Sequence, residues 1–224
     1  MYLLTETASP FALERWAAFF ANFGQFAKGF FYTLGISIGA LIVALLLGLI
    51  FGAMSSTHNK VLRGISRVYV EIFQNTPLLV QFVVVFYGIS ILTDGHIMIP
   101  ISLTAILCVG VYTGAYISEI IRTGIEAVPK GQTEAALSQG FTYADTMRII
   151  ILPQAVRTIL PPLTNQVVNL IKNTSTVAII SGADIMFTAK AWAYDTTNYV
   201  PAFAGAAFLY FIMCFPLALS LIHI

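Results

Sequence analysis

From Gly29 to Thr57 the chain carries no charged residue, and this run constrains the fold more than any other stretch. A helix that crosses the hydrocarbon core of a membrane needs about 20 apolar residues, so the run is long enough to span. Only 9% of all residues are charged, whereas soluble domains carry about 25%. The chain is therefore predicted to be an all-α integral membrane protein with one domain, 1–224.

Hydropathy predicts about five transmembrane helices. Their approximate ranges are 29–54, 64–92, 99–122, 158–182 and 201–222. Pro77 interrupts the second helix and should kink it. Residues 1–27 place Trp16, Phe19 and Phe23 at roughly helical spacing, which predicts an amphipathic lead-in helix at the extracytoplasmic interface.

The fourth helix is expected to hold Pro161 and Pro162 in its first turns, where proline is tolerated. A loop that contains Asp184 and Trp192 should connect it to the fifth helix.

Lysine and arginine residues gather on one side of this layout, which the positive-inside rule makes cytoplasmic. The basic residues on that side are Lys60, Arg63, Arg67, Arg122, Lys130, Arg148 and Arg157. The N-terminus should therefore lie outside, and the C-terminus and the polar region 123–157 should lie in the cytoplasm. The net charge of +1 gives no reason to expect nucleic-acid binding.

The region 123–157 is long for a connection, since most connections in compact domains have about 4–6 residues. Gly131 and Gly140 bracket a short predicted helix, and Gly140 allows a sharp turn with positive φ. A second helix is predicted from about Thr142, ending before Leu152-Pro153. The alternatives are a plain connector between spans and a rigid helix-turn-helix that docks a partner.

Four spaced motifs carry a resemblance to a known family. Glu134-Ala-Ala, Gly140, Ile150 and Leu152-Pro153 follow the spacing of the EAA loop of ABC importer membrane subunits. Three further blocks resemble the polar amino-acid branch of that family, the histidine, glutamine and glutamate permeases. These blocks are 71–81 (EIFQNTPLLVQ), 116–125 (YISEIIRTGI) and 171–175 (IKNTS).

The resemblance implies a type I ABC importer fold and a permease subunit in a bacterial cytoplasmic membrane. Its partners would be an ABC ATPase dimer, a second permease subunit, an extracytoplasmic solute-binding protein and membrane lipid. The chain has no Gly-x-x-x-x-Gly-Lys-Ser/Thr loop, so ATP and magnesium would be bound by the partner and this chain would bind no cofactor. The residues assigned to ATPase coupling are Glu134, Ala135, Ala136, Gly140, Ile150, Leu152 and Pro153.

Polar residues inside the predicted spans mark a candidate substrate pathway, because charge is costly in a membrane. These residues are Glu71, Thr76, Pro77, Gln81, Tyr116, Glu119, Gln166, Asn169, Lys172, Asn173, Thr174 and Ser175. In the functional interpretation Lys172 receives the α-carboxylate of an amino acid, helped by Thr174 and Ser175, and Glu71 or Gln81 meets its amine. In the structural interpretation the charges form ion pairs that fix helix packing, and Pro77 is only a kink.

The neutral Asn173 follows Lys172, whereas some relatives carry an acidic residue there, which favours glutamine or glutamate as the solute. The alternative is a self-sufficient channel or secondary transporter, which would not explain the long polar region. A membrane assembly factor and a membrane enzyme fit less well, since the fourth helix is polar and no catalytic or metal-ligand constellation is spaced for chemistry.

Overall fold

The computed structural model describes residues 9–220, which form helices and no strand. The elements in chain order are α1 (Leu13–Ala21), α2 (Phe23–Ser55), α3 (Lys60–Gln74), α4 (Leu78–Val83), η1 (Val84–Gly88), α5 (Ile89–Leu92), α6 (Ile101–Glu126), α7 (Lys130–Ser138), α8 (Tyr143–Asp145), η2 (Thr146–Ile151), α9 (Leu152–Asn173), η3 (Thr174–Ile180), α10 (Ile185–Thr196) and α11 (Tyr199–Ser220). Of these, η1 and η2 are π-helical and η3 is a 3-10 helix. The all-α membrane fold predicted from hydropathy is confirmed.

Three helices are long and apolar enough to cross a membrane, namely α2, α6 and α11. Helix α2 contains the whole predicted span 29–54. Helix α6 contains the predicted span 99–122 except residues 99 and 100, and α11 contains the predicted span 201–222 up to residue 220, where the described part of the chain ends. Taken together as one bent span, α3 and α4–α5 are also long and apolar enough to cross a membrane. The predicted fourth span corresponds to α9 and η3. This segment is more polar than the three helices above and is not among the helices that could cross a membrane by length and composition alone.

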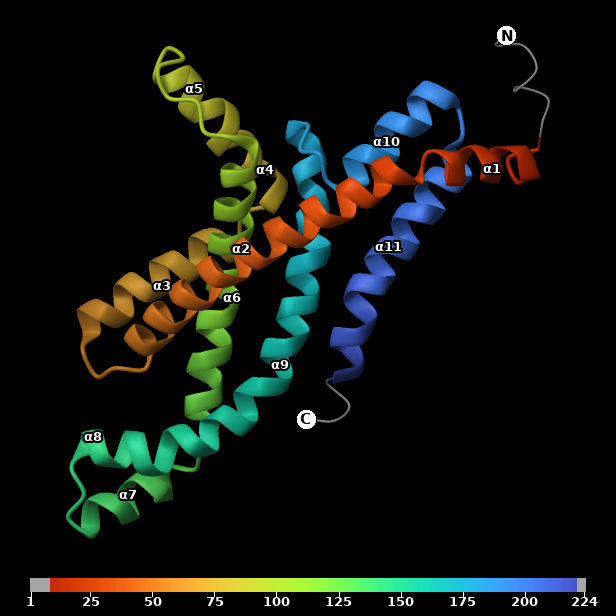
Figure 1. The fold of residues 1–224 in the computed structure, drawn as a ribbon. Coiled ribbons are helices and arrows are strands. Elements are labelled where there is room, and N and C mark those ends of the chain that lie inside the picture. The colour runs from red at the N-terminus through yellow and green to blue at the C-terminus, as the bar shows by residue number, and fades with distance from the viewer. Residues whose placement is uncertain (1–8, 221–224) are drawn as a thin grey trace.

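Helix α2 is the longest element, with 33 residues. At 1.5 Å per residue it is about 50 Å long, whereas the hydrocarbon core is about 30 Å thick. A helix of this length must tilt to keep its apolar surface in the membrane. In Figure 1 it runs obliquely across the molecule, past α6 and towards α1.

Small residues bring α2 and α6 into close contact along a seam. A β-carbon at Gly48 would lie 2.4 Å from Cγ2 of Ile117, and one at Gly110 would lie 2.7 Å from Cβ of Val43. A side chain at either position would force the facing side chain or its backbone to shift. The close approach of the two backbones therefore depends on glycine, as in other membrane helix pairs.

The predicted interruption of helix 64–92 at Pro77 is confirmed, but the bend there is much larger than a kink. The chain forms two arms, α3 and α4–α5, that are bent by 96° relative to each other. Asn75 ends α3, and Pro77 begins α4 with an extended backbone. Proline lacks a backbone donor and keeps the preceding residue out of the helical region, so the helix ends here and restarts in a new direction (Figure 1).

The prediction that a helix ends before Leu152-Pro153 and that the next span begins near residue 158 is also wrong. The π-helix η2 continues directly into α9, and Pro153 occupies the first turn of α9. The amide of Leu152 donates to the carbonyl of Met147 in the wider π-helical turn, so Pro153, which has no amide, follows inside a continuous helical stretch. Pro161 and Pro162 consequently lie inside α9 and not in its first turns.

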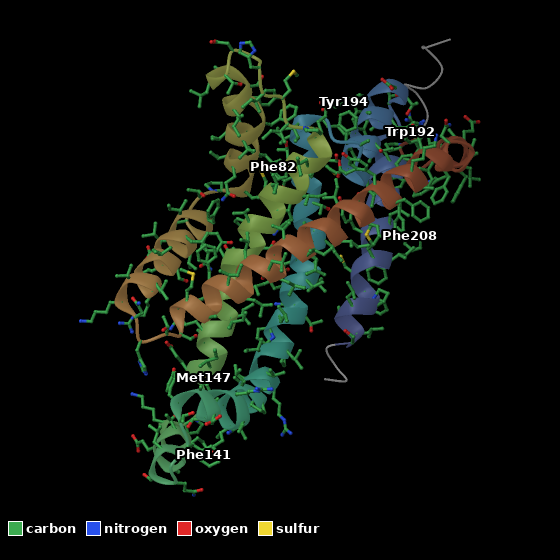
Figure 2. The ribbon with its side chains drawn as sticks, turned by 60° about the vertical axis from the view of Figure 1, so that its left-hand side comes forward. Phe82, Phe141, Met147, Trp192, Tyr194 and Phe208 are labelled. Atoms are coloured by element: carbon green, nitrogen blue, oxygen red, sulfur yellow. The ribbon has the colours of Figure 1, made fainter. Side chains whose placement is uncertain are left out.

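The predicted loop around Asp184 and Trp192 is wrong too, because residues 185–196 form α10. Asp184 caps this helix by accepting hydrogen bonds from the amides of Met186 (3.0 Å) and Phe187 (3.1 Å). Trp192 packs edge-on against Phe19 of α1 and Phe26 of α2. The aromatic side chains thus fasten the N-terminal helix to the end of the bundle where Figure 2 shows Trp192.

Candidate functional site

At the opposite end, α7, α8 and η2 (Lys130–Ile151), here called the lower hairpin, project from the bundle (Figure 1). Gly140 has a φ of +85°, a conformation that side chains disfavour. Its amide donates to the carbonyl of Leu137 (3.0 Å), and the amide of Phe141 donates to that of Ala136 (3.1 Å). These bonds close the end of α7 and turn the chain sharply into α8, as the glycine spacing predicted.

The predicted coupling residues of the lower hairpin divide into buried and exposed positions. Ala136 is buried against the hairpin's own second arm, whereas Glu134, Ala135 and Gly140 are exposed. In the second arm Ile150 is half-buried, and Leu152 and Pro153 are exposed at the start of α9. Glu134 has no ion pair within residues 9–220, so its carboxylate is open to solvent.

Large apolar side chains on the same hairpin are exposed. Leu137 is 48% exposed, Phe141 36% and Ile149 57%, and Figure 2 shows Phe141 at the tip of this end. Beside a polar segment, such a patch is typical of a protein interaction site. The lower hairpin therefore has the composition of a docking element.

Next to the hairpin, a cavity of about 1100 Å³ separates α3 from the end of α6. Glu71 and Glu119 both line it. Glu71 pairs with Arg67 at 3.0 Å, and Glu119 pairs with Arg122, which also contacts Glu126 at 2.5 Å. Both predicted pathway glutamates are thus engaged by arginines of their own helices.

Thr76, Pro77 and Gln81 lie at the break between α3 and α4. Nε2 of Gln81 donates to the carbonyl oxygens of Phe73 and Thr76, each at 3.2 Å, and lies 2.8 Å from Oγ1 of Thr76. The side-chain amide of Gln81 therefore donates to backbone carbonyls at the break, where the regular helical hydrogen bonds are interrupted. Tyr116, on α6, shares a 3.1 Å hydroxyl contact with Tyr112.

Lys172 lines a second, smaller cavity of about 290 Å³ between α9, α10 and α11. The other lining residues are Ser175, Met186, Phe203, Ala206, Ala207 and Tyr210. This cavity shares no lining residue with the first. Glu71 lines the first cavity and Gln81 lines neither, so neither residue shares the cavity of Lys172.

The remaining predicted pathway residues follow α9 and η3. The hydroxyls of Thr174 and Ser175 donate to the carbonyls of Ile171 (2.7 Å) and Lys172 (2.8 Å), so their protons are committed to the backbone. Gln166 is buried, and Asn169 and Asn173 are half-buried. Lys172 is thus the cationic group of the small cavity.

Sequence reasoning missed Tyr210 and Asp184. The hydroxyl of Tyr210 donates to Oδ2 of Asp184 at 3.2 Å, next to the cavity of Lys172. The single tyrosine within the apolar run 200–220 was the available indication, since a hydroxyl in a membrane helix needs a partner.

Apolar spans joined to a projecting hairpin with exposed apolar side chains are typical of membrane subunits of the transport-permease class. The chain belongs to the family described as binding-protein-dependent transport system inner membrane component, which matches residues 44–223. The resemblance to ABC importer permeases is thereby confirmed, and the channel and secondary-transporter alternative is not favoured.

Curated relatives support this membership. The chain is 37% identical to the probable glutamine ABC transporter permease protein GlnM of Bacillus subtilis (strain 168), over 90% of this chain and 92% of that one. It is 35% identical to the glutamate/aspartate import permease protein GltJ of Escherichia coli (strain K12), over 75% and 76%.

Solved structures agree with the fold. The crystal structure of an amino acid ABC transporter with histidines matches 92% of this chain and 95% of its own, with a TM-score of 0.85 and 32% identity. An inward-facing MetNI methionine ABC transporter matches 90% and 96%, with a TM-score of 0.70. At 16% identity the second match shows the fold alone.

Proposed function

We propose that this chain is the permease subunit of an ATP-driven importer that moves a polar amino acid, glutamine or glutamate, across a bacterial cytoplasmic membrane. The observation that carries the proposal is the lower hairpin, in which the Glu134-Ala-Ala motif, the positive φ of Gly140 and an exposed apolar patch lie together. Relatives named for glutamine and for glutamate and aspartate support the solute class.

In this proposal the chain is not catalytic. ATP and magnesium are bound by a separate ATPase dimer, whose two subunits grip the lower hairpins of two permease subunits. An extracytoplasmic solute-binding protein delivers the amino acid. Closure of the ATPase dimer moves the hairpins, and the spans switch between inward and outward access.

The proposed orientation follows from the basic residues. Lys60, Arg63 and Arg67 on α3 and Lys130 on α7 surround the cavity beside the lower hairpin, so the positive-inside rule places that end in the cytoplasm. The N-terminus then lies outside, and the C-terminal end of α11 lies on the cytoplasmic side.

Lys172 is the proposed carboxylate-binding residue. Lys172 lines the small cavity with Met186, Phe203 and Tyr210 and is exposed there, so its charge is accessible to an anion that enters the cavity. Because the hydroxyl protons of Thr174 and Ser175 are used by the backbone, they would assist only as acceptors. The amine would be received by groups other than Glu71, which lines the larger cavity.

The test is uptake of labelled glutamine or glutamate by vesicles that contain this chain with its ATPase and binding protein. Gly140→Asp should abolish ATP-dependent uptake, because the variant adds a side chain at positive φ and a charge on the docking surface. Gly131→Asp is the matched control, since it adds the same charge on the same hairpin where a β-carbon meets nothing within 4 Å.

Uptake that survives Gly140→Asp, or that proceeds without the ATPase, would contradict the proposal. Equal losses in both variants would show that added charge, and not the turn, is responsible. If uptake depends on ATP and is lost only in Gly140→Asp, competition by unlabelled amino acids identifies the solute.

A further inference from the structure

Besides its own packing, the lower hairpin contacts the turn between α2 and α3. The rings of His58, in that turn, and Tyr143, the first residue of α8, have centroids 5.1 Å apart and planes inclined by 47°. Edge and offset contacts of aromatic rings at such distances are favourable. Two segments far apart in the chain therefore meet through one pair of rings.

His58 is joined to the start of α3 by the next residue. Oδ1 of Asn59 accepts hydrogen bonds from the amides of Val61 (2.9 Å) and Leu62 (3.4 Å), and the amide of Asn59 lies 3.4 Å from Oγ1 of Thr57. The turn is thus a capped, hydrogen-bonded unit. A displacement of His58 passes to the first turn of α3.

Helix α3 is anchored along its middle. The hydroxyl of Ser66 donates to the carbonyl of Phe51 on α2 at 2.7 Å, and that of Tyr69 donates to the carbonyl of Val111 on α6 at 2.7 Å. Beyond these anchors α3 ends at the 96° break before α4. At its last residue α3 is held to α6 again, because Nε2 of Gln74 donates to the carbonyl of Ala115 at 3.2 Å. We expect a displacement of the first turn of α3 to rotate the helix about these anchors and so to reach the break.

The large cavity leaves space for that rotation. Lys60, Arg63 and Arg67 line it from α3, and Arg122 and Lys130 line it from the facing side. Its volume of about 1100 Å³ lies between α3, from Lys60 to Gln74, and the end of α6. His58 lines this cavity and Tyr143 does not, so the ring pair connects the lower hairpin to one wall of a space that can narrow.

We propose that His58 and Tyr143 are positioning residues that transmit the movement of the lower hairpin to α3, and so to the α3–α4 break. This inference rests on the proposed ATPase coupling. Loss of the rings leaves the hairpin able to bind the ATPase but weakens the link between ATP hydrolysis and transport.

The experiment uses the assembled transporter in liposomes and measures ATP hydrolysis with and without the solute-loaded binding protein, together with solute uptake. Tyr143→Ala and His58→Ala should each lower the uptake per ATP hydrolysed by about two- to thirtyfold, the range for residues that carry coupling. Tyr143→Phe keeps the ring and should behave as the unsubstituted chain. The double alanine variant should be no worse than either single one, because one contact is lost in all three.

A second measurement follows the cavity itself. Spin labels on Lys60→Cys and Lys130→Cys, both exposed, report the width of the cavity, and the native Cys108 and Cys214 are buried. A non-hydrolysable ATP analogue should change this distance in the unsubstituted background and in Tyr143→Phe. The change should be absent in Tyr143→Ala that still purifies with its ATPase.

Three outcomes would overturn the inference: alanine variants with normal uptake per ATP, additive losses in the double variant, or an unchanged distance response in Tyr143→Ala. If these occur while Gly140→Asp still abolishes uptake, ATPase coupling stands and the ring contact is not part of it. If Gly140→Asp has no effect, the proposed function fails as well.

Discussion

The side-chain amide of Gln81 on α4 donates a hydrogen bond to the backbone carbonyl of Phe73 on α3, with an N–O distance of 3.2 Å. This bond crosses the 96° break between the two arms. Non-helical backbone is tolerated at membrane depth only where its polar groups find partners. Gln81 provides that partner, so a specific side chain stabilises the break.

Replacing Gln81 should loosen the break. Gln81→Leu leaves the carbonyls of Phe73 and Thr76 without this donor, and buried unpaired groups cost about 1–3 kcal/mol. We expect a lower melting temperature in detergent. Gln154→Leu is the control, because Gln154 is exposed and donates only to Ile150 four residues earlier; equal melting temperatures for the two variants would contradict the role of Gln81.

One added methyl group in the α2–α6 seam should lower the stability of the fold. Gly48→Ala places a β-carbon 2.4 Å from Cγ2 of Ile117, and overpacking of this kind costs about 1–3 kcal/mol. Gly35→Ala in the same helix meets nothing within 4 Å and should be neutral or slightly stabilising. Thermal unfolding of both variants checks the prediction, and a Gly48→Ala chain as stable as Gly35→Ala would show that the helices separate at little cost.

Lys172 should control the affinity for the solute. Lys172→Ala removes the cation of the small cavity, and hydrogen bonds to charged groups contribute about 1.5–3 kcal/mol, so the apparent KM for uptake should rise roughly ten- to hundredfold. Lys172→Arg should retain part of the affinity. Lys190→Ala, an exposed cation on α10, serves as the control, and co-purification of the ATPase shows that assembly is intact; unchanged uptake by Lys172→Ala would exclude this role.

Asp184 should make stability depend on pH. Burial raises the pKa of its carboxyl to about 6, from an ordinary value of 3.8, so the folded state holds the proton more tightly than the unfolded state. Its contribution to stability is complete below about pH 4 and is lost as the pH rises through about 6. Asp184→Asn keeps an oxygen for the cap of α10 but cannot titrate.

The measurement is the melting temperature of both chains between pH 4 and pH 7. The advantage of the unsubstituted chain over Asp184→Asn should shrink as the pH rises. A difference that stays constant over this range would mean that Asp184 does not titrate there.

Much of the architecture could be predicted from single residues. The uncharged run from Gly29 to Thr57 determines a span because charge is excluded from the membrane, and Gly140 determines a turn because few other residues accept its φ. Pro77 indicated a break, but the 96° angle depends on how Leu78 and Phe82 are buried against neighbouring helices. That packing is tertiary and leaves no local pattern.

Another error arose at a proline. Pro153 was interpreted as the end of a helix, but it lies inside a continuous helical stretch, directly after a π-helical turn. The sequence did not indicate that the amide of Gln81 contacts backbone carbonyls, because only the folded chain brings them within reach; its role towards a solute stays a prediction. The pathway assignments of Lys172, Glu71 and the residues around them remain predictions.

The glycine seam between α2 and α6 determines which parts of the molecule are able to move. Ile117 and Val43 already fill the spaces beside Gly48 and Gly110. Sliding one backbone along the other would push these side chains against larger neighbours, so we expect the two helices to behave as one stiff frame. In the proposed function, alternating access would then come from elements hinged on this frame, and the α3–α4 break and the turn at Gly140 are the candidates. Substitutions that flex the frame should impair assembly, whereas those at the hinges should alter turnover in a transporter that still assembles.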